Sequence, residues 1–276
     1  MFEITAFIGL SKNVGKTTFL NRYIEKKDNY IITSIGWDGE AVDHIFGIKK
    51  PSILVKKDNF VCTYSKLKPT KSIKILELPI ENQFLGQLEV YKMLDNDIVQ
   101  IAGPSSTKQF QTFLQKTTKE LKNIKEIIID GAADRRISLS FANEIFFIIG
   151  PTFSTNPQKI IDTIIGIVEM FEIPIFNKET IMNKEINLLS SLNKSNINNL
   201  QQSQVYVLEN LGKIIIDYES IPKIMKEYKI FVKNKPHKYS IVVNSFNAEL
   251  MKNTLDTKNI KKEIKILYPK LNIIEI

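Results

Sequence analysis

The sequence predicts an α/β fold built on a doubly wound, mainly parallel sheet. Short apolar segments that suit buried strands alternate with amphipathic segments that suit helices, and this alternation is typical of parallel sheets. Five of the 11 glycines also end or directly follow an apolar segment, where a chain turns at the carboxyl end of a strand. We therefore expect a single domain over residues 1–276, with β-hairpin insertions.

The expected elements follow the chain in order. Strands are predicted at 2–9, 30–35, 73–78, 97–102, 125–130, 144–149, 240–244 and 271–275. Helices are predicted at 16–27, 106–122, 156–171, 219–228 and 247–265. Polar breaks divide residues 51–66 and 84–100, so each is expected to form a hairpin and 51–100 a hairpin-rich insertion. Residues 177–204 are rich in Asn, Ser, Lys and Gln, which predicts a polar surface insertion.

The glycines indicate where a ligand binds. In open parallel sheets, ligands lie outside the carboxyl ends of the strands, and glycine there permits sharp turns and close backbone approach. The five glycines at predicted strand ends therefore favour one shared crevice. They are Gly9, Gly36, Gly103, Gly131 and Gly150.

Composition and charge exclude several classes of protein. The net charge is +8, but lysine is spread along the whole chain, so no nucleic-acid-binding stripe is predicted. No apolar run approaches the roughly 18–20 residues of a membrane span, and Met1 leads straight into a strand, so we expect no signal peptide. Cys62 is the single cysteine. We expect a cytoplasmic protein that engages neither membrane nor nucleic acid.

Residues 9–18 read Gly-Leu-Ser-Lys-Asn-Val-Gly-Lys-Thr-Thr and join a predicted strand to a predicted helix. This is the arrangement of a phosphate-binding P-loop, in which backbone N–H groups and the helix N-terminus attract a phosphate chain. Lys16 is expected to reach the outer phosphates and the Thr17 hydroxyl to ligate Mg²⁺. The predicted nucleotide-binding residues of the loop are Gly9, Asn13, Val14, Gly15, Lys16, Thr17 and Thr18. The expected fold is therefore of the P-loop NTPase type.

A second part of the site is predicted where Ile127-Ile128-Ile129 ends in Asp130, a carboxylate at the tip of an apolar strand. Such a carboxylate beside a P-loop holds Mg²⁺. Glu77 is a rival, but Gly131 leaves room for phosphate beside Asp130. Arg135 and Arg136 follow, in a chain with only one other arginine, and are expected to sense the γ-phosphate, because arginine offers phosphate a planar fork.

The loop after the second predicted strand, Ser-Ile-Gly-Trp-Asp-Gly-Glu at 34–40, is acidic and bounded by glycine. Asp38 is the best candidate to orient an attacking water and a further candidate for the metal, with Glu40 second. The alternative is that these carboxylates cap a helix.

The base is expected to be adenine. A guanine site usually reads Asn-Lys-x-Asp after an apolar strand, whereas residues 177–180 read Asn-Lys-Glu-Thr. Asn244 follows Ile241-Val242-Val243 and is similar to the strand-plus-Asn that contacts adenine in related ATPases. We therefore expect Mg²⁺ and ATP as the cofactors.

The spacing of the loop resembles one class of P-loop proteins, which includes dethiobiotin synthetase, the partitioning ATPases and the metallochaperone GTPases. The first glycine stands one step earlier than in the common motif, and Lys12 lies inside the loop. In some members a loop lysine reaches the phosphates of a partner subunit. That lysine falls at Ser11 here, so Lys12 is one residue out of register. The resemblance implies a possible homodimer.

Three segments, 9–18, 34–51 and 129–136, together resemble the P-loop subunit of the lysine 5,6-aminomutase reactivase of lysine-fermenting bacteria. The resemblance covers about the first half of the chain. It implies a slow ATPase that rescues a cobalamin-dependent aminomutase together with a partner ATPase subunit. The alternatives are a dethiobiotin-synthetase-like ligase and a nucleotide-gated scaffold or metallochaperone-type GTPase.

Overall fold

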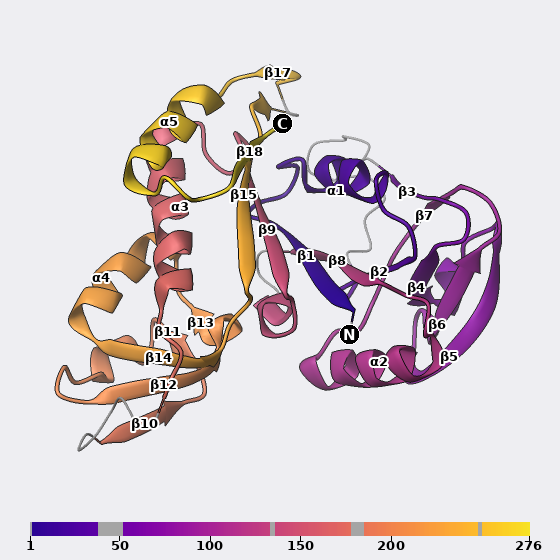
Figure 1. Cartoon of the computed structure of the whole chain (residues 1–276), viewed down its shortest axis with the longest axis horizontal. Coiled ribbons are helices and arrows are strands. Elements are labelled where there is room, and N and C mark those ends of the chain that lie inside the picture. Colours follow the sequence, from indigo (N-terminus) through magenta and orange to yellow (C-terminus); the bar gives the residue numbers. More distant parts are fainter. Residues whose placement is uncertain (1, 38–51, 133–135, 178–184, 248–249) are drawn as a thin grey trace.

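A nine-stranded sheet with the order β18-β15-β9-β1-β8-β2-β4-β6-β5 forms the centre of the protein in a computed structural model (Figure 1). The structure describes residues 2–37, 52–132, 136–177, 185–247 and 250–276. All neighbouring strands from β18 to β4 are parallel, whereas β6 is antiparallel to both β4 and β5. The strands are β1 Glu3–Gly9, β2 Tyr30–Ser34, β4 Phe60–Tyr64, β5 Ser72–Asn82, β6 Gly86–Met93, β8 Glu126–Ala132, β9 Glu144–Ile149, β15 Lys238–Val243 and β18 Ile273–Glu275. The predicted mixed α/β fold with a large, mainly parallel sheet is confirmed.

Both faces of the sheet are covered, as continuous apolar strands require. On β1 the side chains alternate, so that Phe7 packs in one buried cluster and Ile4, Ala6 and Ile8 pack in the other. Helix α1 (Lys16–Ile24) contributes to the Phe7 cluster. The other cluster receives α2 (Thr107–Glu120), α3 (Pro157–Glu172), α4 (Ile221–Glu227) and α5 (Thr257–Leu267).

The prediction of two hairpins, at 51–66 and 84–100, is wrong, because the strands of these segments pair with other partners. The hairpin of this region joins β5 to β6, while β3 (Ile53–Val55) pairs with β7 (Asp97–Val99) as a separate ribbon. Residues 73–78 and 97–102 were expected in the parallel sheet but belong to these antiparallel pairs. The reason is that β4 is buried along almost its whole length and enters the main sheet beside β2, as a strand covered on both faces does.

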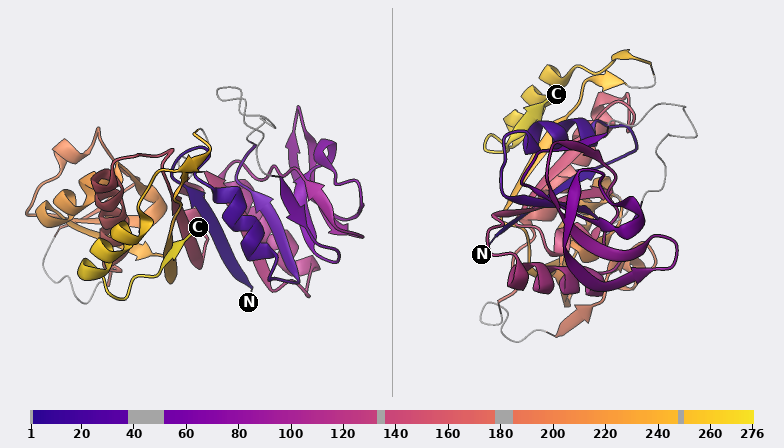
Figure 2. Two further views of the ribbon diagram at one scale, coloured as in Figure 1. Left: turned by 90° about the horizontal axis from the view of Figure 1, so that it is seen from above. Right: turned by 90° about the vertical axis from the view of Figure 1, so that its right-hand side faces the viewer.

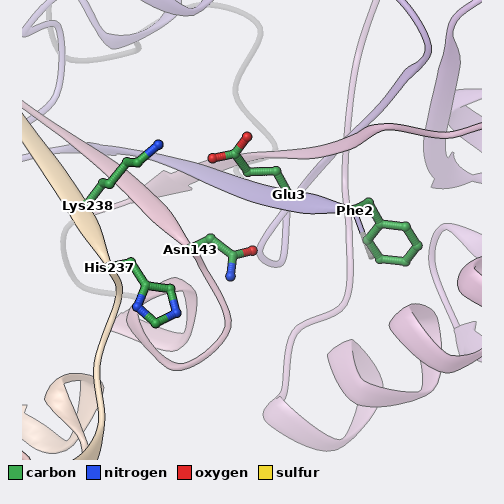
Figure 3. Close-up of a pocket in the computed structure, with 5 residues that line it drawn as sticks. All are labelled: Phe2, Glu3, Asn143, His237 and Lys238. Atoms are coloured by element: carbon green, nitrogen blue, oxygen red, sulfur yellow. The ribbon is translucent and has the colours of Figure 1, made fainter.

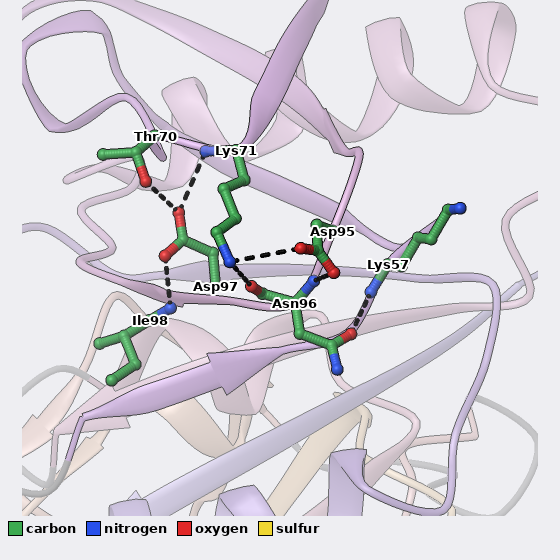
Figure 4. A network of polar contacts seen from close by, with 7 residues as sticks. All are labelled: Lys57, Thr70, Lys71, Asp95, Asn96, Asp97 and Ile98. Atoms are coloured by element: carbon green, nitrogen blue, oxygen red, sulfur yellow. Dashed lines mark hydrogen bonds and ion pairs between the residues drawn. The ribbon is translucent and has the colours of Figure 1, made fainter.

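A polar network holds this antiparallel region together (Figure 4). Asp97 accepts hydrogen bonds from the Thr70 hydroxyl at 2.7 Å and from the Lys71 backbone N–H at 3.2 Å. The hydrogen bond from Thr70 is the main cause that lowers the pKa of Asp97. The Lys71 amine also lies 3.3 Å from Asp95. These exposed contacts fix the start of β5 against the start of β7.

A second, smaller parallel sheet lies at the opposite end of the molecule from β5 (Figures 1 and 2). It has the order β10-β12-β14, with β10 Ile186–Leu189, β12 Val205–Asn210 and β14 Lys229–Asn234. A two-stranded pair, β11 (Leu192–Asn193) with β13 (Ile214–Ile215), lies beside it. The segment predicted as a polar insertion therefore supplies β10 and β11. Within the described residues, the 3₁₀ helices are η1 Ser65–Leu67, η2 Arg136–Ser140, η4 Ile197–Asn199, η5 Leu211–Lys213 and η6 Tyr218–Ser220.

The last helix is shorter than the predicted 247–265. It begins after Asp256, whose side chain accepts a hydrogen bond from the Asn259 N–H at 3.1 Å and so caps the helix. Before it, β16 (Phe246–Asn247) and β17 (Lys252–Asn253) form a short antiparallel pair. Among the helices that the structure describes, none is long and apolar enough to cross a membrane.

The stability of the sheet is expected to depend on Phe147, a fully buried residue of β9 that packs against Phe171 and Tyr218. Replacing Phe147 with Ala is predicted to lower the free energy of unfolding by about 3–5 kcal/mol, because the lost burial leaves a cavity. The matched control is Phe84, which is 69% exposed, and its replacement with Ala is predicted to change stability by less than about 0.5 kcal/mol. Urea denaturation measures both, and equal losses would contradict the packing described here.

Candidate functional site: the loop between β1 and α1

The predicted phosphate loop connects β1 to α1 and lies at the carboxyl edge of the central sheet (Figure 1). Gly9 at the end of β1 is in register with Ala132 of β8 and with Ile148 of β9. Asp130 of β8 is in register with Ser34 at the end of β2. The ends of four parallel strands therefore meet where the sequence predicts a shared crevice.

The backbone of the loop is bent tightly before α1 begins. Two residues have a left-handed backbone, Asn13 with φ 58° and Gly15 with φ 91°. The Leu10 N–H donates to the Ile148 carbonyl at 2.9 Å and ties the start of the loop to β9. Gly15 is the N-cap of α1, and no side chain of the described residues caps this helix end. Backbone N–H groups of the first turn of α1 are thus available to an anion.

Lys16 and Asp130 form an ion pair directly at this helix end. Both side chains are largely buried, with exposed fractions of 22% for Lys16 and 16% for Asp130. Thr17, the next residue of α1, is partly buried, and Lys12 and Thr18 are exposed. The structure therefore brings the predicted phosphate-binding lysine together with Asp130, one of the three residues predicted to hold Mg²⁺, and Thr17 follows Lys16 in α1.

Asn244 directly follows β15, and its side chain hydrogen-bonds to the backbone of the loop. Its side chain is 7% exposed, and its amide donates to the Val14 carbonyl at 3.0 Å and to the Phe246 carbonyl at 3.3 Å. Its side-chain oxygen accepts from the Phe246 N–H at 3.0 Å. The contact with adenine expected of Asn244 stays a prediction, and it would have to coexist with these hydrogen bonds.

The turn after β2 is held in place by two glycines. The Gly36 N–H donates to the Pro104 carbonyl, and the Gly103 N–H donates to the Gly36 carbonyl, each at 3.0 Å. A Cβ on Gly103 would lie 1.9 Å from the Ser34 carbonyl oxygen, so only glycine allows this approach. The turn leads to Trp37, which is 46% exposed at the same edge.

Two predicted catalytic residues, Asp38 and Arg135, lie outside the described residues. Arg136 begins η2, directly downstream of β8, but its side chain is not among those described. The roles of these three residues, as water-orienting carboxylate and γ-phosphate sensors, therefore stay predictions.

The rival metal residue Glu77 lies far from the loop. It stands on β5, at the outer end of the sheet, and pairs with Lys74 at 3.0 Å. Three strands separate β5 from β8, which corresponds to about 19 Å at the usual strand spacing. The preference for Asp130 over Glu77 thus agrees with the strand order.

Two contacts of the loop were not predicted from the sequence. The Ser11 hydroxyl lies 3.3 Å from the Thr152 hydroxyl in the turn after β9, and Asn244 reaches the Val14 carbonyl across 230 residues of sequence. An Asn directly after a predicted strand is visible in the sequence. Its target is not, because a main-chain carbonyl carries no signature in the residue type.

A shallow hollow of about 300 Å³ lies at the opposite, amino edge of the sheet and is lined by Phe2, Glu3, Asn143, His237 and Lys238 (Figure 3). Asn143 lies there just before β9 and hydrogen-bonds to the two neighbouring strands. Its side-chain oxygen accepts from the Ile4 N–H at 2.8 Å, and its carbonyl accepts from the N–H groups of His237 and Lys238. Asn143 therefore links the starts of β1, β9 and β15 at this edge.

No group of three or more His, Cys, Asp or Glu side chains suited to a metal ion exists in the part of the chain that the structure describes. A Mg²⁺ bound with a nucleotide does not need one, because it takes one or two protein ligands together with phosphate oxygens and water. Thr17 and Asp130 fit that donor set. Comparison with models of known protein families and with curated protein sequences returns no match.

The left-handed backbone of Gly15 yields a testable prediction. Replacing Gly15 with Ala is expected to lower the free energy of unfolding by about 1–2 kcal/mol, because an L-residue is strained in this conformation. The new Cβ would also lie 2.7 Å from the side-chain nitrogen of Asn244. Chemical denaturation measures the loss, and an unchanged or higher stability would contradict the described loop geometry.

Proposed function

We propose that the protein binds Mg·ATP at the carboxyl edge of its central sheet, with the phosphate chain on residues 9–18. The observation that carries this proposal is the Lys16–Asp130 pair at an uncapped helix N-terminus. A cation, a carboxylate and free backbone N–H groups stand together there, and they are the groups that a metal-bound polyphosphate requires.

Lys16 has two possible partners in this proposal. Without nucleotide its amine is neutralised by Asp130. A bound triphosphate offers Lys16 a stronger anion and releases the Asp130 carboxylate. Asp130 and the Thr17 hydroxyl then hold Mg²⁺, whose charge offsets that of the phosphates.

Hydrolysis is proposed to be slow in the isolated protein, because switch ATPases typically need a partner to complete the site. Asp38 is proposed to orient the attacking water. Lys12, Arg135 and Arg136 are proposed to offset negative charge on the γ-phosphate.

The proposed biological role is reactivation of a cobalamin-dependent lysine 5,6-aminomutase, together with a partner ATPase subunit. It is supported by the resemblance of segments 9–18, 34–51 and 129–136. Reactivation requires that nucleotide turnover respond to the inactivated enzyme, and this response separates the role from the alternatives.

The binding site is tested by replacing Lys16 with Ala. We expect Mg·ATP affinity to fall about 10- to 100-fold, because a charge-assisted contact of about 1.5–3 kcal/mol is lost. Titration calorimetry measures the change. Lys26, an exposed lysine just beyond α1, is the matched control, and its replacement with Ala is expected to leave affinity unchanged. Equal affinity of the wild type and the Lys16 variant rules out the site.

The biological role is tested by phosphate release from ATP under three conditions: protein alone, with diaminopelargonate and bicarbonate, and with an inactivated cobalamin-dependent aminomutase. We expect slow release alone and stimulation only by the aminomutase. Stimulation by the small amine would instead indicate a dethiobiotin-synthetase-like ligase. ATP binding with no release in any condition would indicate a nucleotide-gated scaffold.

A further inference from the structure

The side chain of Asn244 is the contact through which strand β15 reaches the phosphate loop. Its amide is buried and donates to the Val14 carbonyl, the last carbonyl before Gly15. A peptide unit is planar and trans, so its C=O and N–H point in opposite directions. By holding the Val14 carbonyl, Asn244 directs the Gly15 N–H away from itself.

Two glycines make room for this contact. A Cβ on Gly15 would lie 2.7 Å from the Asn244 side-chain nitrogen. A Cβ on Gly150 would lie 3.1 Å from the Asn244 Cβ and 3.5 Å from the Val14 carbonyl oxygen. The loop, the turn after β9 and the amide are thus packed so closely that the position of Asn244 and the course of the loop depend on each other.

We propose that Asn244 is a positioning residue for phosphate binding, which holds the loop in its anion-binding shape and does not select the base. The proposal rests on the proposed function, because its effect on affinity requires a phosphate ligand on residues 9–18. It differs from a base-reading role in what it predicts. A bracing residue changes the affinity for every triphosphate equally, whereas a base-reading residue changes the preference between ATP and GTP.

The first test measures the binding of Mg·ATP, Mg·GTP and inorganic triphosphate to an Asn244→Ala variant. We expect all three affinities to fall together by about five- to tenfold, the effect of one lost hydrogen bond, with the ATP-to-GTP ratio unchanged. A changed ratio with unaltered triphosphate binding overturns the proposal and assigns Asn244 to the base.

The matched control is Asn59, a buried asparagine at the opposite edge of the sheet. It is 1% exposed, donates to the carbonyls of Lys56 and Lys57 and accepts from the Tyr30 N–H. Asn59→Ala therefore removes the same kind of hydrogen bonds far from the loop. If it weakens triphosphate binding as much as Asn244→Ala does, the effect is general destabilisation and the proposal is wrong.

A second readout needs no ligand. Hydrogen exchange of the backbone amides of residues 10–18 is expected to be faster in Asn244→Ala than in the wild type and in Asn59→Ala. Gly150→Ala keeps the Asn244 side chain but crowds it, and it is expected to speed exchange in the same residues. Unchanged exchange in both loop variants overturns the proposal. If exchange is faster in Asn244→Ala but the wild-type protein binds no triphosphate, the proposed function is refuted and the bracing of the loop is still supported.

Discussion

Lys16 and Asp130 stand 114 residues apart in the sequence and meet at the carboxyl edge of the sheet. One is the first residue of α1 and the other lies near the end of the neighbouring strand β8. Each is largely shielded from water, so each charge needs the other, and removing one partner leaves the other uncompensated. In the proposed function the same pair also supplies the chemistry of the site, since a bound phosphate would compete with Asp130 for the lysine.

The backbone around this pair is constrained at several points. Gly15 adopts a conformation that L-residues disfavour, and the Asn244 amide fills the space that a side chain at position 15 would need. Gly103 lets the segment 103–104 approach Ser34 and Gly36, at the end of β2 and in the turn after it, closely. These constraints fix the shape of the loop in the free protein, which would lower the entropy cost of binding the proposed phosphate ligand.

The central part of the fold could be predicted from the sequence, because its strands are continuous apolar runs that end in glycine or in a polar residue. The positions of residues 9–18 and of Asp130 at the carboxyl edge could be predicted for the same reason: both lie directly at the ends of such runs. The strand pairing within residues 51–100 could not be predicted, because it depends on β4 entering the main sheet beside β2. The apolar pattern of a short strand does not indicate which strand it pairs with. The short strands β10 and β11 were hidden by the polar composition of the surrounding segment 177–204. The Asn244 contact was hidden because its target is a backbone carbonyl.

The central claim is that residues 9–18 receive the phosphates of Mg·ATP. Hydrogen exchange of individual backbone amides, compared between the free protein and the protein with Mg·ATP, tests it most directly. The account predicts protection at the amides of residues 15–18, and no such protection when AMP replaces ATP. Protection that instead appears at the amino edge, around Phe2, Asn143 and Lys238, would contradict it.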